Sequence, residues 1–271
     1  MHFDGFAMVK PKLRMVHNMA RSGGTLTCKC IGCMEGVVLL SELHPMAWKL
    51  FNPIKQAEEW FGLVKQSDLR ELHNKGGTTY AKAIALIDRR CKESGKTLVL
   101  RDWSHLDYTG YPLVSAPAYR PLLYAELTES FDILRISITR DPVTQWQSLA
   151  RLGVMQGALR SGKFGVDKYL VGYRKYAELC VQTGFVRYED FLRDAESEMK
   201  RICEHLEIRF DPAFSEKWPA YTTITGDINP NNPNKITERP RRPVDPSLKK
   251  SFLANPEYHR ACELLGYETL R

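Results

Sequence analysis

The length, composition and charge of the chain exclude several classes of protein. It has 271 residues, 43% of them hydrophobic, and a net charge of +7. A chain of this kind can bury a full core, and we expect one domain over residues 1–271. No run approaches the roughly 20 apolar residues of a membrane span, and residues 1–10 lack a signal-peptide pattern. The seven cysteines follow no small disulfide scaffold, so we expect a cytoplasmic protein without a membrane partner.

The positive charge favours an anionic ligand, and nucleic acid is one class of such ligand. Lys and Arg are scattered along the chain instead of forming a dense stripe. No helix-turn-helix, zinc-finger or RNA-recognition signature is present, so we expect no nucleic-acid partner. A ligand with several negative charges would account for part of the excess. Charge that only keeps the protein in solution is the alternative explanation.

Strand and helix patterns alternate along the chain, which predicts βαβ units. The predicted strands span residues 14–18, 36–41, 97–102, 133–139 and 184–188. The predicted helices span residues 78–94, 141–154, 166–182, 194–206 and 246–265. We therefore expect an α/β protein with a P-loop-like three-layer fold around a central, mostly parallel sheet. Proline-rich loops cover residues 104–121 and 218–246, and loops of that length are usually lids or binding surfaces.

A glycine-rich turn joins the first predicted strand to the helix that follows it. Gly23 and Gly24 let the backbone approach a ligand, and the free amides at the start of the helix would point toward it. A guanidinium and three hydroxyls are added by Arg21, Ser22, Thr25 and Thr27. The turn lacks the Lys-Ser/Thr pair of a nucleotide-triphosphatase P-loop. It predicts a phosphate or sulfate site, and an ordinary strand-to-helix turn is the alternative.

A second group of residues follows the fourth predicted strand. Arg140 stands at the carboxyl end of that strand, and Asp141-Pro142 has the pattern of an N-cap and a first helical residue. This edge of an open α/β sheet faces the ligand crevice, and Ser148, two turns into the helix, can reach the same side. The pair suits a second phosphate. The alternative is a surface arginine that caps the strand and a serine that faces water.

Three segments resemble motifs of the sulfotransferase family, whose members move a sulfuryl group from 3'-phosphoadenosine 5'-phosphosulfate (PAPS) to an acceptor. Residues 20–25, Ala-Arg-Ser-Gly-Gly-Thr, are similar to its 5'-phosphosulfate loop. Residues 140–148 are similar to its 3'-phosphate motif, which combines an arginine with a later serine. Residues 186–191, Val-Arg-Tyr-Glu-Asp-Phe, are similar to the segment whose tyrosine, here Tyr188, lies near the adenine. The order and spacing of the three segments agree with the family.

The resemblance implies a binding site for PAPS that requires no metal. The implied binding residues are Arg21, Ser22, Gly23, Gly24, Thr25, Leu26, Arg140, Ser148 and Tyr188. The proline-rich tail adds Arg239, Arg241 and Arg242, which would close over the 3'-phosphate, with a solvated basic loop as the alternative.

The sequence also departs from the family pattern. Ala20 replaces a frequent proline, and Gly24 replaces a threonine that often holds the phosphosulfate. The Arg/Lys-Lys-Gly signature of the cytosolic small-molecule branch is missing. The chain therefore looks more like the bacterial and the tyrosine- or carbohydrate-directed branches.

Three residues are predicted to act in catalysis. Arg21 would stabilise the charge on the leaving oxygen, because sulfuryl transfer has a loose transition state with charge spread over its oxygens. Glu42 follows the second predicted strand, near where tyrosine- and carbohydrate-directed relatives carry a catalytic glutamate. His105 follows the third, near the catalytic histidine of the small-molecule branch, whose Lys-Thr-His has become Arg-Asp-Trp-Ser-His. We favour Glu42 as the base and His105 as a contact to the acceptor. A surface ion pair and a backbone-bonded loop histidine are the alternatives.

The predicted function is in-line transfer of a sulfuryl group from PAPS to the hydroxyl of a small-molecule, carbohydrate or tyrosine-type acceptor. Two other functions stay open. A P-loop-like kinase or nucleotide hydrolase would bind ATP and magnesium, which the missing Walker lysine argues against. A polyanion-binding module would keep the fold without turnover. The loops at 104–121 and 218–246 are the segments expected to select the acceptor.

Overall fold

A five-stranded parallel sheet forms the centre of the molecule. The computed structural model describes residues 9–74, 79–111, 113–226, 235–238 and 240–271. The strands are β1 (Lys12–Asn18), β2 (Val37–Leu43), β3 (Thr97–Asp102), β4 (Asp132–Thr139) and β5 (Phe185–Arg187), in the spatial order β2-β3-β1-β4-β5. All neighbouring strands are parallel. The predicted α/β fold with a parallel sheet is therefore confirmed.

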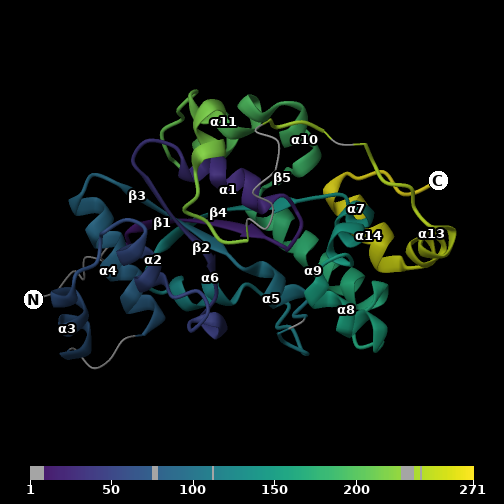
Figure 1. The fold of residues 1–271 in the computed structure, drawn as a ribbon, viewed down its shortest axis with the longest axis horizontal. Coiled ribbons are helices and arrows are strands. Elements are labelled where there is room, and N and C mark those ends of the chain that lie inside the picture. Colours follow the sequence, from purple (N-terminus) through teal and green to yellow (C-terminus); the bar gives the residue numbers. More distant parts are fainter. Residues whose placement is uncertain (1–8, 75–78, 112, 227–234, 239) are drawn as a thin grey trace, which may run out of the picture.

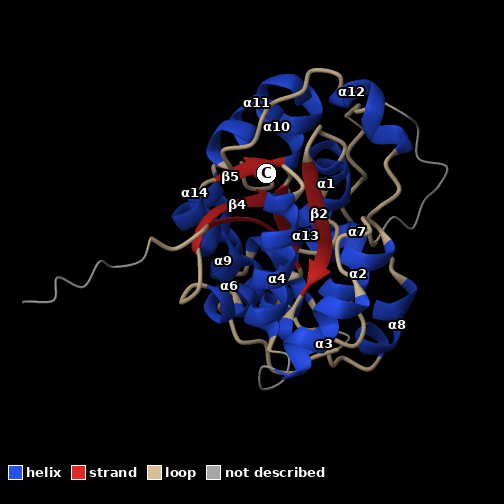
Figure 2. Cartoon of the chain, turned by 90° about the vertical axis from the view of Figure 1, so that its left-hand side faces the viewer, coloured by secondary structure: helices blue, strands red, loops and turns tan. Residues whose placement is uncertain are grey.

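Helices cover both faces of the sheet (Figures 1 and 2). One face carries α1 (Gly24–Gly32), α10 (Tyr188–Arg193), α11 (Ala195–His205), α12 (Phe214–Lys217) and the 3-10 turn η2 (Trp218–Ala220). The other carries η1 (Pro45–Ala47), α2 (Pro53–Glu59), α3 (Gln66–Asn74), α4 (Tyr80–Glu93), α5 (Ser104–Tyr108), α6 (Leu122–Leu127) and α9 (Val166–Thr183). Around α9, at the right of Figure 1, lie α7 (Pro142–Leu149), α8 (Gly153–Arg160), α13 (Pro246–Leu253) and α14 (Pro256–Leu265).

Alternate side chains of the strands enter separate cores on the two faces of the sheet. Val16 and Val99 pack in one core with Cys28 of α1. Met15 and Leu100 point the other way and pack in a core with Ile84 of α4. Parallel strands covered on both faces are apolar along most of their length, because both sets of side chains are buried. This burial explains why the strands could be predicted from short apolar runs.

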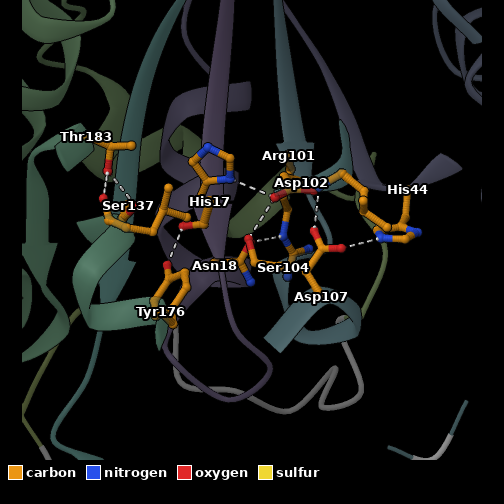
Figure 3. Close-up of polar contacts among 12 residues, drawn as sticks. His17, Asn18, His44, Arg101, Asp102, Ser104, Asp107, Ser137, Tyr176 and Thr183 are labelled. Carbon is orange, nitrogen blue, oxygen red and sulfur yellow. Dashed lines mark hydrogen bonds and ion pairs between the residues drawn. The ribbon is translucent and has the colours of Figure 1, made fainter. Parts of the chain in front are cut away.

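Polar side chains replace the apolar ones at the carboxyl ends of the central strands (Figure 3). His17 Nδ1 donates a hydrogen bond of 2.6 Å to Asp102 Oδ2, and Ser104 Oγ donates to the same oxygen at 2.8 Å. Tyr176 of α9 donates to the carbonyl oxygens of His17 and Ile138, each at 2.9 Å. Each of these hydrogen bonds joins neighbouring elements, so the network fixes the edge of the sheet from which the functional loops emerge.

Two of the predicted helices are each divided in the structure. Within 246–265, α13 ends at Leu253 and α14 begins at Pro256, where Asn255 caps the new helix through its side chain. Within 141–154, α7 ends at Leu149 and α8 begins at Gly153. The prediction of one continuous helix was wrong in both places. An Asn-Pro pair starts a new helix, because proline lacks the amide that a helix interior requires.

Candidate functional site

The turn between β1 and α1 has the backbone of an anion-binding loop. Arg21 and Gly23 have φ angles of 66° and 92°. Ser22 is buried and its Oγ donates to the carbonyl oxygen of Met19 at 2.8 Å, so it holds the turn closed. Gly24 begins α1, whose N-terminus has no side-chain cap. The first amides of α1 therefore have no helical acceptor and are available to an anion.

The remaining predicted residues of this turn differ in what they offer a ligand. Leu26 packs its side chain against the core beside α1 and contributes only its amide. Thr25 Oγ1 accepts a hydrogen bond of 3.1 Å from Arg101 Nη2. Thr27 is buried and donates to the carbonyl oxygen of Gly23 at 3.4 Å, so its hydroxyl is used within the turn.

Both glycines of the turn are required by close neighbours. A Cβ at Gly23 would lie 2.1 Å from Cδ2 of Tyr188, and one at Gly24 would lie 2.4 Å from Cγ of Asn18. These distances are below van der Waals contact, so any larger residue would displace a side chain. The ring of Tyr188 therefore lies directly against the turn, and the predicted contact of this residue with an adenine stays a prediction.

Replacing Gly23 should destabilise the protein more than replacing a glycine with open surroundings. We expect Gly23→Ala to lower the free energy of unfolding by roughly 2–4 kcal/mol, because positive φ costs an L residue energy and the new methyl group overpacks. Gly95→Ala is the matched control, since Gly95 has a φ of 67° and no neighbour within 4 Å. Urea unfolding measures both variants. Equal losses would contradict the close packing of Tyr188 on the turn.

The structure brings the two predicted anion-binding groups together. Arg21 Nε donates to Ser148 Oγ at 2.9 Å, and Arg140 Nη1 donates to the carbonyl oxygen of Arg21 at 3.1 Å. The guanidinium of Arg140 lies 5.1 Å from the centre of the Tyr188 ring. Its buried Nε has no hydrogen-bond partner among the described residues. Two guanidinium groups, a hydroxyl and an aromatic ring thus meet at the N-terminus of α1.

The positive charges at this edge of the sheet lie close to one another. Burial lowers the pKa of the Arg21 guanidinium, and the charges of Arg140 and Arg242 lower it further. Such a cluster of like charges is unfavourable in the protein alone. A bound ligand with several negative charges would offset the repulsion.

The proline-rich tail reaches the site through Arg242. Gln147 Nε2 donates 2.9 Å to the carbonyl oxygen of Pro243, which holds this part of the tail against α7. Arg241 and Arg242 are both exposed, and the charge of Arg242 contributes to lowering the pKa of Arg21. The third predicted tail residue, Arg239, lies outside the described residues. The structure therefore supports Arg242 as the arginine of the tail that adds charge to the site.

A bulge in the edge strand β2 determines the direction of Glu42. The pairing of β2 with β3 shifts in register between Leu40 and Leu43, and Glu42 has a φ of 53°. The side-chain amide of Gln56 takes the place of a neighbouring strand: its Oε1 accepts from Ser41 N at 2.7 Å and its Nε2 donates to Ser41 O at 2.9 Å. Bulges redirect side chains at strand ends, and here Gln56 stabilises one.

The carboxylate of Glu42 faces the anion-binding turn. A Cβ at Gly226 would lie 2.9 Å from Glu42 Oε1 and 3.6 Å from Thr25 Oγ1, so both groups border the same glycine. Glu42 Oε1 also lies 3.6 Å from Arg101 Nη2. The predicted base and the predicted phosphosulfate loop are therefore close in space, although β2 and β1 are separated by β3 in the sheet.

Arg101 joins these two parts of the site and is a candidate functional residue that the sequence prediction did not include. Its buried guanidinium donates hydrogen bonds of 3.0 to 3.1 Å to Asn18 Oδ1, Thr25 Oγ1, Ser41 Oγ and the carbonyl oxygen of Thr225. Arg101 lies near the carboxyl end of β3, as Arg140 follows β4. The same rule, that charged residues at strand ends face the ligand crevice, is the signal that identifies it.

His105 is enclosed within its own loop. Its Nε2 donates to the carbonyl oxygen of Tyr111 at 2.8 Å, and its Nδ1 accepts from Thr109 Oγ1 at 2.6 Å. Burial lowers the pKa of His105 to about 4. The imidazole is therefore neutral near pH 7, and both of its nitrogens are occupied. This arrangement favours Glu42 over His105 as the residue that reaches an acceptor.

The buried state of His105 should make stability depend on pH. Its pKa falls from 6.5 to about 4 in the folded protein, so the unfolded chain binds more protons between these values and stability decreases as pH falls through that range. We expect the difference in unfolding free energy between wild type and His105→Gln to change by on the order of 3 kcal/mol across the range. Urea unfolding at several pH values measures it. A difference that is independent of pH would contradict the burial.

Comparison with a family model bears on the segment that carries Arg140, Ser148 and Tyr188. Residues 132–212, which run from β4 to the loop after α11, match the model of the Sulfotransferase family. This segment of the chain is therefore similar to the sulfotransferase family. The match includes the predicted 3'-phosphate motif and the tyrosine beside the glycine-rich turn.

Solved sulfotransferase domains have the same fold. The sulfotransferase domain of the Synechococcus PCC 7002 olefin synthase is 17% identical, with a TM-score of 0.61 over 99% of each chain. The sulfotransferase domain from the curacin biosynthetic pathway is 16% identical, with a TM-score of 0.64 over 97% of this chain and 100% of that one. No curated protein sequence matches the chain significantly. At these identities the similarity establishes the fold alone. The role of each residue is therefore inferred from the geometry of the site.

Three further observations concern the part of the chain that the structure describes. In the part of the chain that the structure describes, no three His, Cys, Asp or Glu side chains are grouped so that they could hold a metal ion. None of the described helices combines the length and the apolar character that crossing a bilayer requires. All seven cysteines carry free thiols.

Proposed function

We propose that this protein is a sulfotransferase, which binds PAPS at the carboxyl edge of the sheet and transfers the sulfuryl group in line to a hydroxyl acceptor. The observation that supports this proposal is the meeting of Arg21, Arg140 and the N-terminus of α1, joined through Ser148. Arg21 and the α1 amides would hold the 5'-phosphosulfate. Arg140 and Ser148 would hold the 3'-phosphate, and the ring of Tyr188 offers the adenine an apolar face.

The proposed reaction exchanges one bond to sulfur for another. The acceptor oxygen forms a bond to sulfur while the bond between sulfur and the bridging phosphate oxygen breaks. Arg21 and the α1 amides stabilise the negative charge that develops on that bridging oxygen. Glu42 takes the proton of the acceptor hydroxyl. Both residues have positive φ angles, a conformation that is unfavourable without glycine and is concentrated at sites of chemistry.

Arg101 acts in this proposal as a positioning residue. It hydrogen-bonds Thr25 at the start of α1 and Ser41 beside Glu42, so the phosphosulfate loop and the base keep a fixed separation. In-line transfer requires such a separation, because small displacements of the reacting groups cost large factors in rate. The same guanidinium donates to the carbonyl oxygen of Thr225 at 3.0 Å. This hydrogen bond holds the neighbouring Gly226 beside Glu42 and Thr25.

Thermal unfolding separates this function from its alternatives. A ligand that binds only the native state raises the melting temperature. We expect adenosine 3',5'-bisphosphate to raise it more than ADP does, with or without magnesium. A larger effect of ADP with magnesium would instead indicate the kinase or nucleotide hydrolase. Release of adenosine 3',5'-bisphosphate from PAPS in the presence of an acceptor distinguishes an enzyme from a polyanion-binding module.

A further inference from the structure

The first two residues of α10 contact both anion-binding segments of the candidate site. The ring of Tyr188 lies against the glycine-rich turn, where a Cβ at Gly23 would be 2.1 Å from its Cδ2. The next residue, Glu189, reaches the other segment. Its Oε1 accepts a hydrogen bond of 3.0 Å from the backbone amide of Asp141, the residue directly after Arg140. The start of α10 therefore connects the two segments through neighbouring side chains.

The peptide group that joins Arg140 to Asp141 is hydrogen-bonded on both sides. Its N–H is the amide that donates to Glu189. Its carbonyl oxygen accepts from the hydroxyl of Tyr173 on α9, whose oxygen in turn accepts from Thr139 Oγ1 at 3.0 Å. Asp141 and Tyr173 are buried, and buried backbone groups need such partners because water does not reach them. The backbone that carries the Arg140 side chain is therefore held in one orientation.

The C-terminal segment supplies the second partner of Glu189. The hydroxyl of Tyr267 donates to Glu189 Oε2 at 3.0 Å. Burial and the charge of Glu189 raise the pKa of Tyr267, so the hydroxyl keeps its proton and acts as the donor near neutral pH. Each oxygen of the Glu189 carboxylate thus accepts one hydrogen bond. The carboxylate is fixed between the backbone after Arg140 and the C-terminal segment.

Tyr267 is itself held by a helix end and a strand end. The helix α14 ends at Gly266, whose φ of 68° turns the chain, and the amide of Tyr267 donates to the carbonyl oxygen of Cys262 at 3.0 Å. Arg187 at the end of β5 donates to the carbonyl oxygen of Gly266 at 2.8 Å. Its guanidinium lies 5.7 Å from the centre of the Tyr267 ring. These contacts fix the hydroxyl of Tyr267 beside Glu189 without any ligand.

The side chain of Arg140 keeps hydrogen-bonding capacity, whereas its backbone does not. Its buried Nε has no partner among the described residues. The peptide group after it has a partner on each side. A cation whose backbone is fixed and whose donor is unused is suited to an anion, because the binding geometry then exists before the ligand arrives.

We infer that Glu189 and Tyr267 are positioning residues for the 3'-phosphate of the nucleotide, because they hold the backbone of Arg140 so that its guanidinium is directed at that group before binding. The identity of the ligand is taken from the proposed function, on which this inference therefore rests. Neither residue contacts the nucleotide, and both act through Arg140. Their replacement should therefore weaken the binding of a nucleotide that carries a 3'-phosphate more than that of one without it.

Two nucleotides that differ only in the 3'-phosphate separate this role from a general structural one. Calorimetry should show that Glu189→Ala binds adenosine 3',5'-bisphosphate on the order of tenfold more weakly than wild type, while its affinity for AMP stays within a factor of about 2. Glu189→Gln keeps an oxygen that accepts from the amide of Asp141, so it should retain the affinity of wild type for both nucleotides. Glu198→Ala is the matched control, because Glu198 is a partly buried glutamate of α11, paired with Arg201 at 2.6 Å, and it should change neither affinity.

Tyr267→Phe tests the C-terminal contact by a smaller change, and it decides the question should Glu189→Ala not fold. It removes one hydroxyl and keeps the ring beside Arg187, so we expect about fivefold weaker binding of adenosine 3',5'-bisphosphate and an unchanged affinity for AMP. Tyr124→Phe on α6 is the matched control, since that ring also lies against an arginine, with the guanidinium of Arg135 3.7 Å from its centre. Equal losses for both nucleotides, or no loss for either, would overturn the inference.

Hydrogen exchange measured by NMR tests the backbone contact without a nucleotide. The amide of Asp141 should exchange at least about tenfold faster in Glu189→Ala than in wild type, and it should keep its protection in Glu189→Gln. Failure of wild type to bind adenosine 3',5'-bisphosphate would contradict the proposed function, and faster exchange would then still show that Glu189 holds the backbone of Arg140. Unchanged exchange in Glu189→Ala would overturn the inference, whichever nucleotide the protein binds.

Discussion

Replacing Glu42 by glutamine should lower kcat by about 10²- to 10⁴-fold, the usual contribution of a general base. The amide has the same size, and its oxygen can still lie near Arg101, which is 3.6 Å from Glu42 Oε1. The bulge held by Gln56 should therefore persist, but the side chain can no longer take the acceptor proton. The measurement is the release of adenosine 3',5'-bisphosphate from PAPS with an acceptor that the wild type turns over.

The controls for this variant separate chemistry from binding. The affinity for adenosine 3',5'-bisphosphate should stay within a factor of about 3, since only the base is changed. Glu59→Gln should be silent, because Glu59 is an exposed residue of α2 that lies 3.8 Å from Lys55. Wild-type turnover in Glu42→Gln together with loss of turnover in His105→Gln would show that the base had been assigned to the wrong residue.

Replacing Arg21 by alanine should lower kcat by about 10²- to 10³-fold, the loss typical of one donor to a developing oxyanion. The guanidinium lies against Ser148 and next to Arg140, so its removal also weakens the binding of a polyanionic nucleotide. Arg21→Lys should retain part of the rate, because it keeps the charge and loses the planar group that donates to Ser148. Turnover kinetics with PAPS as the varied substrate separate the two effects.

An exposed arginine provides the control for Arg21. Arg160→Ala at the end of α8 removes the same charge from the surface and should change neither kcat nor KM. A variant Arg21→Ala that bound PAPS less tightly and turned it over at the wild-type rate would contradict a role in the transition state. That result would favour a role for the guanidinium in binding PAPS alone.

The sheet and the anion-binding turn could be predicted because their signals are local. Each strand is a short apolar run, and the predicted strand bounds lie within two residues of β1 to β5. Arg21 and Gly23 belong to a short turn that the glycine pair between a strand pattern and a helix pattern identifies in the sequence. Arg140 was predicted by its place at a strand end, and the parallel sheet then brought it to Arg21, as the bond of 3.1 Å between them confirms.

The rest of the site depends on contacts between distant segments, which no local pattern contains. The direction of Glu42 depends on a bulge that Gln56 stabilises from α2. Arg101 derives its role from hydrogen bonds to Asn18, Thr25 and Thr225 on three other segments. His105 was predicted from a position near the end of a strand. The loop folds so that the carbonyl oxygen of Tyr111 accepts a hydrogen bond from its Nε2. The spacing of residues in the sequence identifies which residues lie at the carboxyl edge of the sheet. Packing between distant segments then determines which of their side chains face the ligand.

In the proposed site, adjacent arginines hold different ends of one nucleotide: Arg21 contacts the 5'-phosphosulfate and Arg140 contacts the 3'-phosphate. The most direct test compares the affinity of adenosine 3',5'-bisphosphate with that of AMP, which lacks the 3'-phosphate, in wild type and in Arg140→Met. Arg140 also supports the turn through the carbonyl oxygen of Arg21, and that contribution affects both ligands equally. We predict that calorimetry will show that Arg140→Met binds adenosine 3',5'-bisphosphate about 10- to 100-fold more weakly than wild type, as for one lost charged hydrogen-bonding group. The reduction in affinity for AMP should be smaller by a factor of at least about 10. An equal loss for the two ligands would contradict the assignment of Arg140 to the 3'-phosphate.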